Sequence, residues 1–357
     1  MRILWFNWRD IKNPDAGGAE VFTHEVMSRL AKKGYDMTLF TSRVSNLSQE
    51  EKIDGVKIVR RGGKTTVYSK AKEFYNRNRS NYDFIIDEIN TRPFLTPTFV
   101  KGKPILAVFH QLAREFWFYE TFFPLNFIGY YYLEKRWLSY YRNIPTVTVS
   151  NSSKEDLQAL GFTSILLVPQ GLSVTPLSKV PEKESNPTIA FLGRLKKAKL
   201  PHHAIHAFDL IKKEIPNSKM WIIGDGYMSE KLKKLNISDV FFYGHIKDQL
   251  KFKMLGRAHI VLVPAIREGW GLVVTESNAM GTPAIAYNVP GLRDSVINKG
   301  TGVLVEENYP RELASSAIAL LQDNALLAKY SNDALTFSRQ FSWDNTASAF
   351  ENIIRHI

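Results

Sequence analysis

Two carboxylates, Glu268 and Glu276, stand on either side of the glycine-rich stretch 269–271. The apolar run 259–264 before them is typical of a buried strand, and the residues 272–280 after the glycines predict a helix. A strand, a glycine turn and a helix together aim backbone N–H groups at a phosphate. Both carboxylates would then face one ligand that carries hydroxyls as well as phosphates. A nucleotide sugar has that chemistry.

A plain structural interpretation also exists, because a glutamate in an early helical turn can simply complement the helix dipole. The surrounding residues favour the ligand site. The stretch 264–283 resembles the signature of the family-four retaining glycosyltransferases with the GT-B fold, and the resemblance continues through 284–294 and 300–305. It implies that Glu268 contacts the donor sugar and that Glu276 holds the ribose hydroxyls. It extends donor binding to the turn and the helix start, namely Gly269, Trp270, Gly271 and Leu272.

A cationic loop opens the second half of the chain. A predicted strand ends at Gly193, and Arg194 and Lys199 follow. Arginine as a planar fork and lysine as a point charge suit a diphosphate, although a cationic loop is often only solvated. The resemblance implies that both cations bind the donor diphosphate and take part in catalysis. One departure from the family pattern weakens the assignment of Lys199 to the diphosphate, because Leu200-Pro201 stands where the family usually has a glycine after the lysine.

Two further turns are expected beside the nucleotide. Gly224 follows a predicted strand, but Ser229 stands where a dinucleotide-binding fingerprint would have its third glycine, which argues against a dehydrogenase. The resemblance places this turn beside the nucleotide and the turn ending at Ile246 against the base. The sequence has no Asp-x-Asp triplet to hold a metal on a diphosphate. We therefore expect no essential metal and no cofactor.

The first half has its own candidate residues. Gly17 and Gly18 precede a predicted helix, where backbone can approach an anion closely. His110 ends a predicted strand, and the resemblance implies contact with the donor sugar, although a single histidine is commonly a satisfied structural residue. Glu88 and Asn90 end another predicted strand and are candidates for acceptor contact.

An aromatic segment, 115–137, follows His110, and a basic segment, 64–79, precedes it in the chain. Aromatic rings combined with cations suit a bilayer interface. A helix packed in the core with solvated charges is the alternative. Because many members of the resembled family act on lipid-linked acceptors, we expect peripheral binding to an anionic membrane surface.

Composition narrows the class of protein. The chain has 357 residues, a formal net charge of +12 and no cysteine. The charge favours phosphorylated or other anionic partners, and no nucleic-acid-binding motif accompanies it. No run approaches the roughly 20 apolar residues of a membrane span. The N-terminus does not read as a secretory signal, so the expected location is the cytoplasm, at most peripheral to the inner face of the cell membrane.

Strand-like and helix-like runs alternate along the chain and predict βαβ units with parallel sheets. In the first half, strands are expected over 2–7, 36–42, 83–88, 104–110 and 146–150, and helices over 18–33, 65–79, 116–142 and 152–160. In the second half, strands are expected over 188–193, 219–224, 239–243, 259–264, 284–288 and 302–306. The proline-rich break 174–187 separates two series. The expected fold is therefore α/β, with an acceptor-binding Rossmann-like domain over 1–172 and a donor-binding Rossmann-like domain over 186–342 that face a central cleft. The resemblance implies that 343–357 crosses back onto the first domain.

The expected activity is transfer of a sugar from a UDP- or GDP-linked donor to a hydroxyl or phosphate acceptor, which can be lipid-linked, with retention at the anomeric carbon. Three alternatives stay open. One is another GT-B chemistry, such as a nucleotide-sugar epimerase or a phosphorylase. The others are a non-catalytic sugar-nucleotide-binding partner subunit and a basic nucleic-acid binder.

Overall fold

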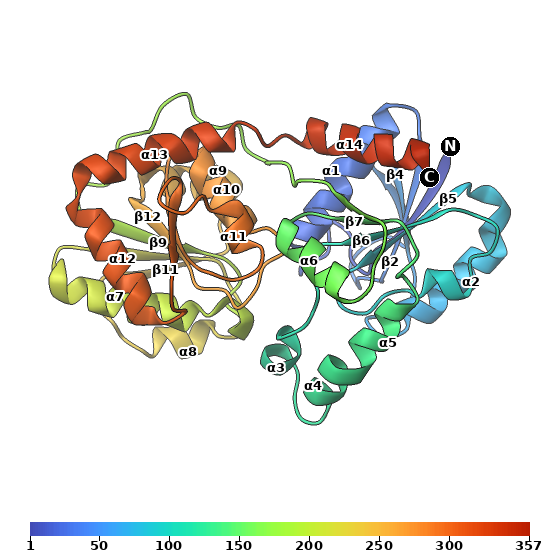
Figure 1. The fold of residues 1–357 in the computed structure, drawn as a ribbon, viewed down its shortest axis with the longest axis horizontal. Coiled ribbons are helices and arrows are strands. Elements are labelled where there is room, and N and C mark those ends of the chain that lie inside the picture. The colour runs from blue at the N-terminus through green and yellow to red at the C-terminus, as the bar shows by residue number, and fades with distance from the viewer. The chain divides into compact units, whose positions relative to one another are not determined.

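The computed structural model describes all residues, 1–357, and separates into two compact units (Figure 1). The N-terminal unit comprises Met1–Trp117, Phe122–Gly171 and Ser342–Ile357. The C-terminal unit comprises Phe118–Thr121 and Leu172–Phe341. Each unit has one sheet, and all strand pairs are parallel, as the alternation of strand and helix patterns predicted, except for one antiparallel pair in the N-terminal unit.

The N-terminal sheet has eight strands in the order β3-β4-β2-β1-β5-β6-β7-β8. Its central strands read as continuous apolar runs because helices cover both faces, and Ile3–Phe6 of β1 are fully buried. The edge strand β3 forms an antiparallel hairpin with β4, and the prediction from the sequence missed both strands, as it missed β8. The strands are β1 Arg2–Phe6, β2 Asp36–Thr41, β3 Glu50–Ile53, β4 Val56–Arg60, β5 Phe84–Ile89, β6 Ile105–Phe109, β7 Thr146–Thr148 and β8 Ile165–Leu167.

Four longer helices accompany this sheet, and three of them lie within two residues of the predicted bounds. They are α1 Gly18–Lys32, α2 Val67–Asn78, α6 Asn151–Ala159 and α14 Trp343–His356. Short 3-10 turns occur at Arg79–Asn81 and Thr96–Thr98.

The expected single helix over 116–142 is wrong. The segment forms α3 Phe116–Glu120 and, after a break at 121–124, a continuous helical stretch. That stretch consists of α4 Leu125–Ile128, a π-helical turn Gly129–Leu133 and α5 Glu134–Ser139. Pro124 lacks the N–H that a continuous helix would need, which separates α3 from α4.

The C-terminal sheet has six parallel strands in the order β11-β10-β9-β12-β13-β14, and all six were predicted. They are β9 Thr188–Leu192, β10 Lys219–Ile223, β11 Val240–Gly244, β12 Ile260–Val263, β13 Ala284–Tyr287 and β14 Gly302–Val305. In this sheet β9 and β12 are neighbours, although β10 and β11 lie between them in the sequence. Such a switch point opens a crevice at the carboxyl ends of the strands.

Helices line both faces of this second sheet; in Figure 1, α7 and α12 lie below it and α10 and α13 above it. They are α7 Pro201–Glu214, α8 Ser229–Lys233, α9 Asp248–Arg257, α10 Leu272–Ala279, α11 Leu292–Ser295, α12 Pro310–Gln322 and α13 Asn324–Ser338. A 3-10 turn, η4, spans Lys197–Lys199. The predicted break 174–187 has no regular element, and Lys183 anchors it by donating hydrogen bonds to the carbonyls of Gly256 and Gly281.

The C-terminal helix α14 belongs to the N-terminal unit, where it packs on α1. Phe350 is fully buried, and its ring stacks on Trp5 with the centroids 5.1 Å apart. An ion pair between Lys33 and Glu351, 2.6 Å long, flanks this contact. The chain therefore leaves the first unit after Gly171 and returns to it at Ser342.

We expect Phe350→Ala to destabilise the N-terminal unit by about 3–5 kcal/mol, because it removes a buried ring and leaves a cavity beside Trp5. Urea unfolding followed by tryptophan fluorescence measures the change. Asn352→Ala on the exposed side of the same helix is the control and should shift stability by less than about 0.5 kcal/mol. Equal stability of the two variants would show that α14 does not hold this unit together.

Candidate functional site

The glycine turn between β12 and α10 lies at the carboxyl end of the C-terminal sheet. Gly271 caps α10 in the left-handed region, with φ of +97°, and Leu272 begins the helix. Glu268 precedes the turn, and its backbone N–H donates a 3.0 Å hydrogen bond to the Pro290 carbonyl. The strand, turn and helix predicted from the sequence are therefore present, and the carboxylate side chain stands at the end of the strand where ligands bind in α/β folds.

Gly291 makes this placement possible. A Cβ atom built on Gly291 would lie 2.2 Å from the Glu268 carbonyl oxygen, which no real side chain tolerates. Its φ of +83° is a second reason for glycine here. The loop before α11 is thus in direct backbone contact with Glu268. The sequence reading did not identify Gly291 as a site residue, although the resemblance extended across it.

Glu268 forms an ion pair with Lys199, which lies at the end of η4. Both side chains are partly buried, with 16% and 25% of their surfaces exposed. The pair brings together two residues that the sequence reading had assigned separately. Leu200-Pro201, the departure from the family pattern, ends η4 and begins α7 without removing Lys199 from the site.

Glu276 is the second carboxylate, on α10, and it accepts a 3.3 Å hydrogen bond from Lys251 of α9. Burial raises the pKa of the Glu276 carboxyl, and the nearby Lys251 ammonium opposes that rise. Lys251 also pairs with Asp248 at 3.0 Å. Sequence reasoning missed Lys251, because nothing in the composition of α9 distinguishes this lysine from its solvent-facing neighbours.

Three strand-end loops meet at the carboxyl edge of the C-terminal sheet. A Cβ atom on Gly224 would lie 2.0 Å from the Gly193 carbonyl oxygen, so the loops after β9 and β10 touch through glycine backbone. The Gly224 N–H donates a 2.8 Å hydrogen bond to the Gly244 carbonyl at the end of β11. Arg194 and Ile246, the expected phosphate and base contacts, follow these loops and are both partly buried.

Trp270 lies within the glycine turn, next to Gly269. Its ring packs edge-on against Phe341 with the centroids 5.5 Å apart. The indole Nε1–H is buried and has no hydrogen-bond acceptor in the protein. A buried donor without an acceptor is costly, so an oxygen-rich ligand at this turn would gain from meeting it.

The N-terminal unit places His110 at the end of β6 in a buried hydrogen-bond network. Its Nε2 lies 3.0 Å from Glu88 Oε1, and its Nδ1 lies 3.3 Å from Gln170 Nε2. The carboxylate can only accept and the amide nitrogen can only donate, so Nε2 carries the proton and Nδ1 accepts. Both ring nitrogens are occupied, which disfavours His110 as a general base.

Glu88 was expected to contact an acceptor, and the structure assigns it a different role. Its side chain is fully buried, and its second oxygen accepts hydrogen bonds from Trp5 Nε1 at 2.7 Å and from the Thr23 hydroxyl. Glu88 therefore orients His110 from inside the unit. Asn90 remains partly exposed and bonds to Asn7 at 3.1 Å.

The glycine loop lies before α1, where Gly17 is the N-cap and Gly18 the first helical residue. The Gly17 N–H donates a 2.6 Å hydrogen bond to Glu20, which also pairs with Arg9 at 2.9 Å. Burial raises the pKa of the Glu20 carboxyl, and the Arg9 guanidinium opposes the rise. The glutamate thus fixes the loop conformation at the start of α1.

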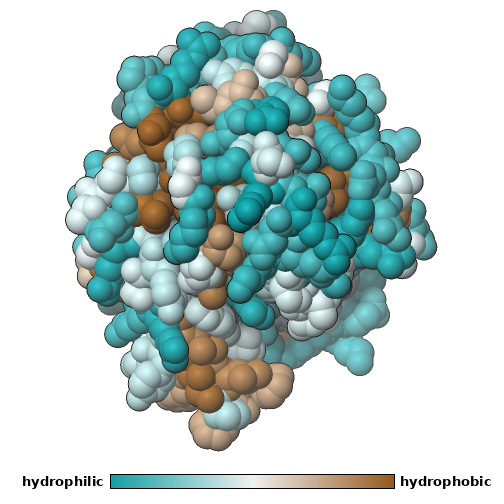
Figure 2. Space-filling model, turned by 90° about the vertical axis from the view of Figure 1, so that its right-hand side faces the viewer, coloured by the Kyte–Doolittle hydropathy of each residue, from teal (hydrophilic) through white to brown (hydrophobic).

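The aromatic segment leaves many rings in solvent. Phe122 and Phe123 are 71% and 75% exposed, and Tyr132 is 73% exposed. Figure 2 has hydrophobic side chains gathered at the lower end of the face it displays, the level at which Figure 1 has α4. The guanidinium of Arg92 lies 4.3 Å from the Tyr68 ring of α2 and 5.9 Å from the Trp137 ring of α5, so the basic and aromatic segments are neighbours.

No helix of the protein has the length and apolar character that crossing a bilayer requires. No group of three or more His, Asp or Glu side chains is arranged to hold a metal ion.

Two family models match the chain. The Glycosyltransferase Family 4 model matches residues 16–175, and the Glycosyl transferases group 1 model matches residues 177–336. Glycogen synthase of Mycobacterium tuberculosis is 27% identical over 214 residues, which are 57% of this chain and 52% of that protein. The chain spans about half the length of the curated relatives it matches.

Solved structures of other proteins share this fold over nearly the whole length of the chain. A sucrose-phosphate synthase from Thermosynechococcus elongatus has a TM-score of 0.80 at 19% identity, covering 99% of this chain and 98% of that one. Anabaena HepE, solved in complex with UDP-glucose, has a TM-score of 0.77 at 15% identity, covering 100% of both chains. The fold is therefore the expected GT-B fold, and because the two family models together run from residue 16 to residue 336, the chain belongs to the group 1, family-four glycosyltransferases.

Proposed function

We propose that this protein transfers a sugar from a nucleoside diphosphate to a hydroxyl or phosphate acceptor with retention of the anomeric configuration. One observation carries the proposal: Glu268 with Lys199, and Glu276 with Lys251, flank a glycine turn at the carboxyl ends of the C-terminal strands. That arrangement offers cations for a diphosphate and carboxylates for sugar and ribose hydroxyls. The complex of Anabaena HepE with UDP-glucose supports a uridine nucleotide as the first donor to test.

In the proposed donor complex, the C-terminal unit holds the nucleotide sugar. Glu276 accepts hydrogen bonds from the ribose hydroxyls, and Glu268 accepts them from the sugar. Arg194, Lys199 and the backbone N–H groups at the start of α10 face the diphosphate. These groups stabilise negative charge that grows on the leaving oxygen, and preorganised charges of this kind are a large source of rate enhancement.

The proposed reaction exchanges one bond at the anomeric carbon. The bond to the diphosphate oxygen breaks while the acceptor oxygen attacks from the same face, and the acceptor proton passes to the departing phosphate. This route needs neither a covalent enzyme nucleophile nor a metal. The route does not call on His110 as a general base. A contact between its ring and the substrate would have to replace the hydrogen bond to Glu88 or the one to Gln170.

The acceptor side of the proposal is a lipid-linked substrate at an anionic membrane surface, on the cytoplasmic side. The exposed rings around α4 supply an apolar contact, and the basic helix α2 lies next to α5 through Arg92. Rings and cations in one place are the combination that favours a bilayer interface. Some of the charge is internally paired, because Lys70 and Arg77 both contact Glu73, so the rings are the sharper test.

Donor binding is the first expected outcome. In a thermal-shift screen of UDP-, GDP- and dTDP-sugars, each with EDTA and with magnesium, one nucleotide should raise the melting temperature irrespective of the metal. Glu276→Ala should lose that shift, because it removes the proposed ribose acceptor. Glu307→Ala, an exposed glutamate of the same unit, should keep it. No shift with any donor would contradict the donor site and favour a protein without nucleotide-sugar binding.

Catalysis is expected to depend on Lys199 more than binding does. With the donor identified above, Lys199→Ala should lower kcat about a hundredfold, since it removes a charge that stabilises the leaving diphosphate. Release of nucleoside diphosphate on transfer measures the rate, and Lys213→Ala, a surface lysine of α7, is the matched control. A product in which the donor sugar is epimerised, with no transfer, would instead establish the epimerase chemistry.

Membrane binding makes a separate prediction. The protein should co-sediment with vesicles containing anionic lipid, and the double variant Phe122→Ser/Phe123→Ser should bind at least about tenfold more weakly, because each buried ring contributes roughly 1.5–3 kcal/mol. Tyr309→Ser, which removes an exposed ring of the C-terminal unit, should bind normally. Failure of the unaltered protein to sediment with these vesicles would contradict the membrane proposal and leave the donor site untouched.

A further inference from the structure

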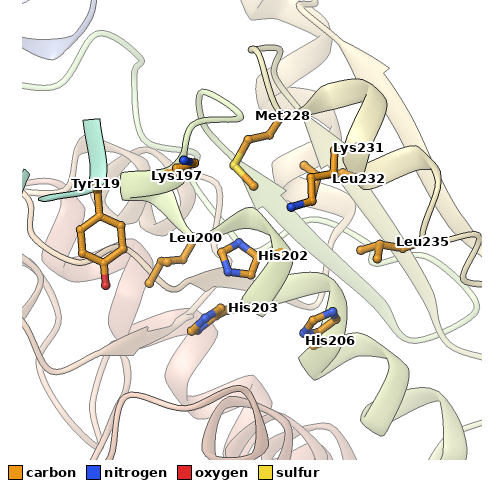
Figure 3. Close-up of a pocket in the computed structure, with 10 residues that line it drawn as sticks. All are labelled: Tyr119, Lys197, Leu200, His202, His203, His206, Met228, Lys231, Leu232 and Leu235. Atoms are coloured by element: carbon orange, nitrogen blue, oxygen red, sulfur yellow. The ribbon is translucent and has the colours of Figure 1, made fainter. Parts of the chain in front are cut away.

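A cavity of about 440 Å³ lies within the C-terminal unit, apart from the two carboxylates of the donor site. It is bordered by the start of α7, by α8 and by the turn η4, with Tyr119 at one side (Figure 3). Cavities of this size hold small ligands in other proteins. None of the sequence predictions assigned a role to it.

The body of the cavity is apolar. Leu200, Met228 and Leu232 are almost fully buried in its wall, at 7%, 7% and 2% exposure. Leu235 and the ring of Tyr119 add partly exposed apolar surface at its edge. Such walls favour an aromatic or aliphatic group, which gains by leaving water.

Three histidines of α7 line the cavity, and His202 lies centrally in Figure 3. His203 is already engaged, because its Nδ1 lies 2.7 Å from the Tyr287 hydroxyl. The Nδ1 of His202 is buried without a partner. Burial lowers the pKa of His202, and the charges of His206 and Lys231 lower it further. An acceptor oxygen of a ligand would satisfy this buried nitrogen and favour the protonated ring.

Two lysines complete the lining. Lys197 of η4 and Lys231 of α8 both border the cavity, and neither ammonium has an ion-pair or hydrogen-bond partner in the protein. Other lysines nearby are paired, such as Lys233 with Glu230 and Lys199 with Glu268. Two unpaired cations beside an apolar cavity call for a doubly charged anion. The histidines do not form a metal site, since no cluster of three ligands is arranged for one.

We infer that this cavity is a second ligand site, for a small organic phosphate monoester with an apolar body. The apolar body lies against Leu200, Met228 and Leu232, and the phosphate faces Lys197, Lys231 and the Nδ1 of His202. The site is distinct from the proposed donor site in residues and in ligand, because no lining residue belongs to the glycine turn. It shares a wall with η4, the turn that carries Lys199.

Isothermal titration calorimetry with 1-naphthyl phosphate tests the inference. Inorganic phosphate and 1-naphthol probe the phosphate group and the apolar body separately. The intact probe should bind more tightly than either part. Lys231→Ala should weaken it about tenfold, the size expected for losing one charge-assisted contact. Lys234→Ala, which removes a lysine just after α8 that does not line the cavity, should bind as the unaltered protein does.

Two further measurements separate this site from the donor site. In ¹⁵N-histidine NMR spectra the probe should move the ring signals of His202 and leave those of His110 in place. Arg194→Ala should bind the probe normally. Absence of binding, or binding that Arg194→Ala abolishes and Lys231→Ala leaves unchanged, would overturn the inference. Loss of nucleotide-sugar binding elsewhere in the protein would not affect it.

Discussion

Contact of backbone with backbone at the carboxyl ends of the C-terminal strands is the constraint on which the candidate donor site depends. Gly291 lies against the Glu268 carbonyl, and Gly224 lies against that of Gly193, at separations that leave no room for a side chain. Loops held this closely cannot move independently. The carboxylate of Glu268 and the loops that carry Arg194 and Lys199 are therefore positioned by main chain, the most rigid support that a loop site can have.

Electrostatic balance follows from that geometry. Each of the two partly buried carboxylates loses hydration, and each is matched by one lysine from a neighbouring element. Lys199 and Lys251 reach them from η4 and from α9, respectively. A diphosphate arriving between these groups would compete with Glu268 for Lys199 and release the carboxylate toward the sugar. In the proposed donor complex, one ion pair would thus connect recognition of the leaving group with recognition of the sugar.

The buried polar groups of the N-terminal unit serve a different purpose, which is to hold an internal network. Glu88 gathers Trp5, Thr23 and His110 in one internal network, while α14 closes the unit over the same tryptophan through Phe350. Positioning of His110 and attachment of the last helix are consequently linked through Trp5. The rings of Phe122 and Phe123, in contrast, contribute little to this core and remain available to an external apolar surface.

The sequence by itself determined the alternation of strands and helices, the glycine turn with its two carboxylates, and the family. Periodicity and turn residues are local properties, which explains why all six C-terminal strands were predicted. The break of the aromatic segment at Pro124 and the hairpin of β3 with β4 are local features that the prediction overlooked. Long-range packing decided the pairing of Lys251 with Glu276 and the burial of Glu88, which depend on residues distant in the chain. The partner of a side chain and its exposure depend on which other elements the fold packs against it, and no local sequence pattern determines those tertiary contacts.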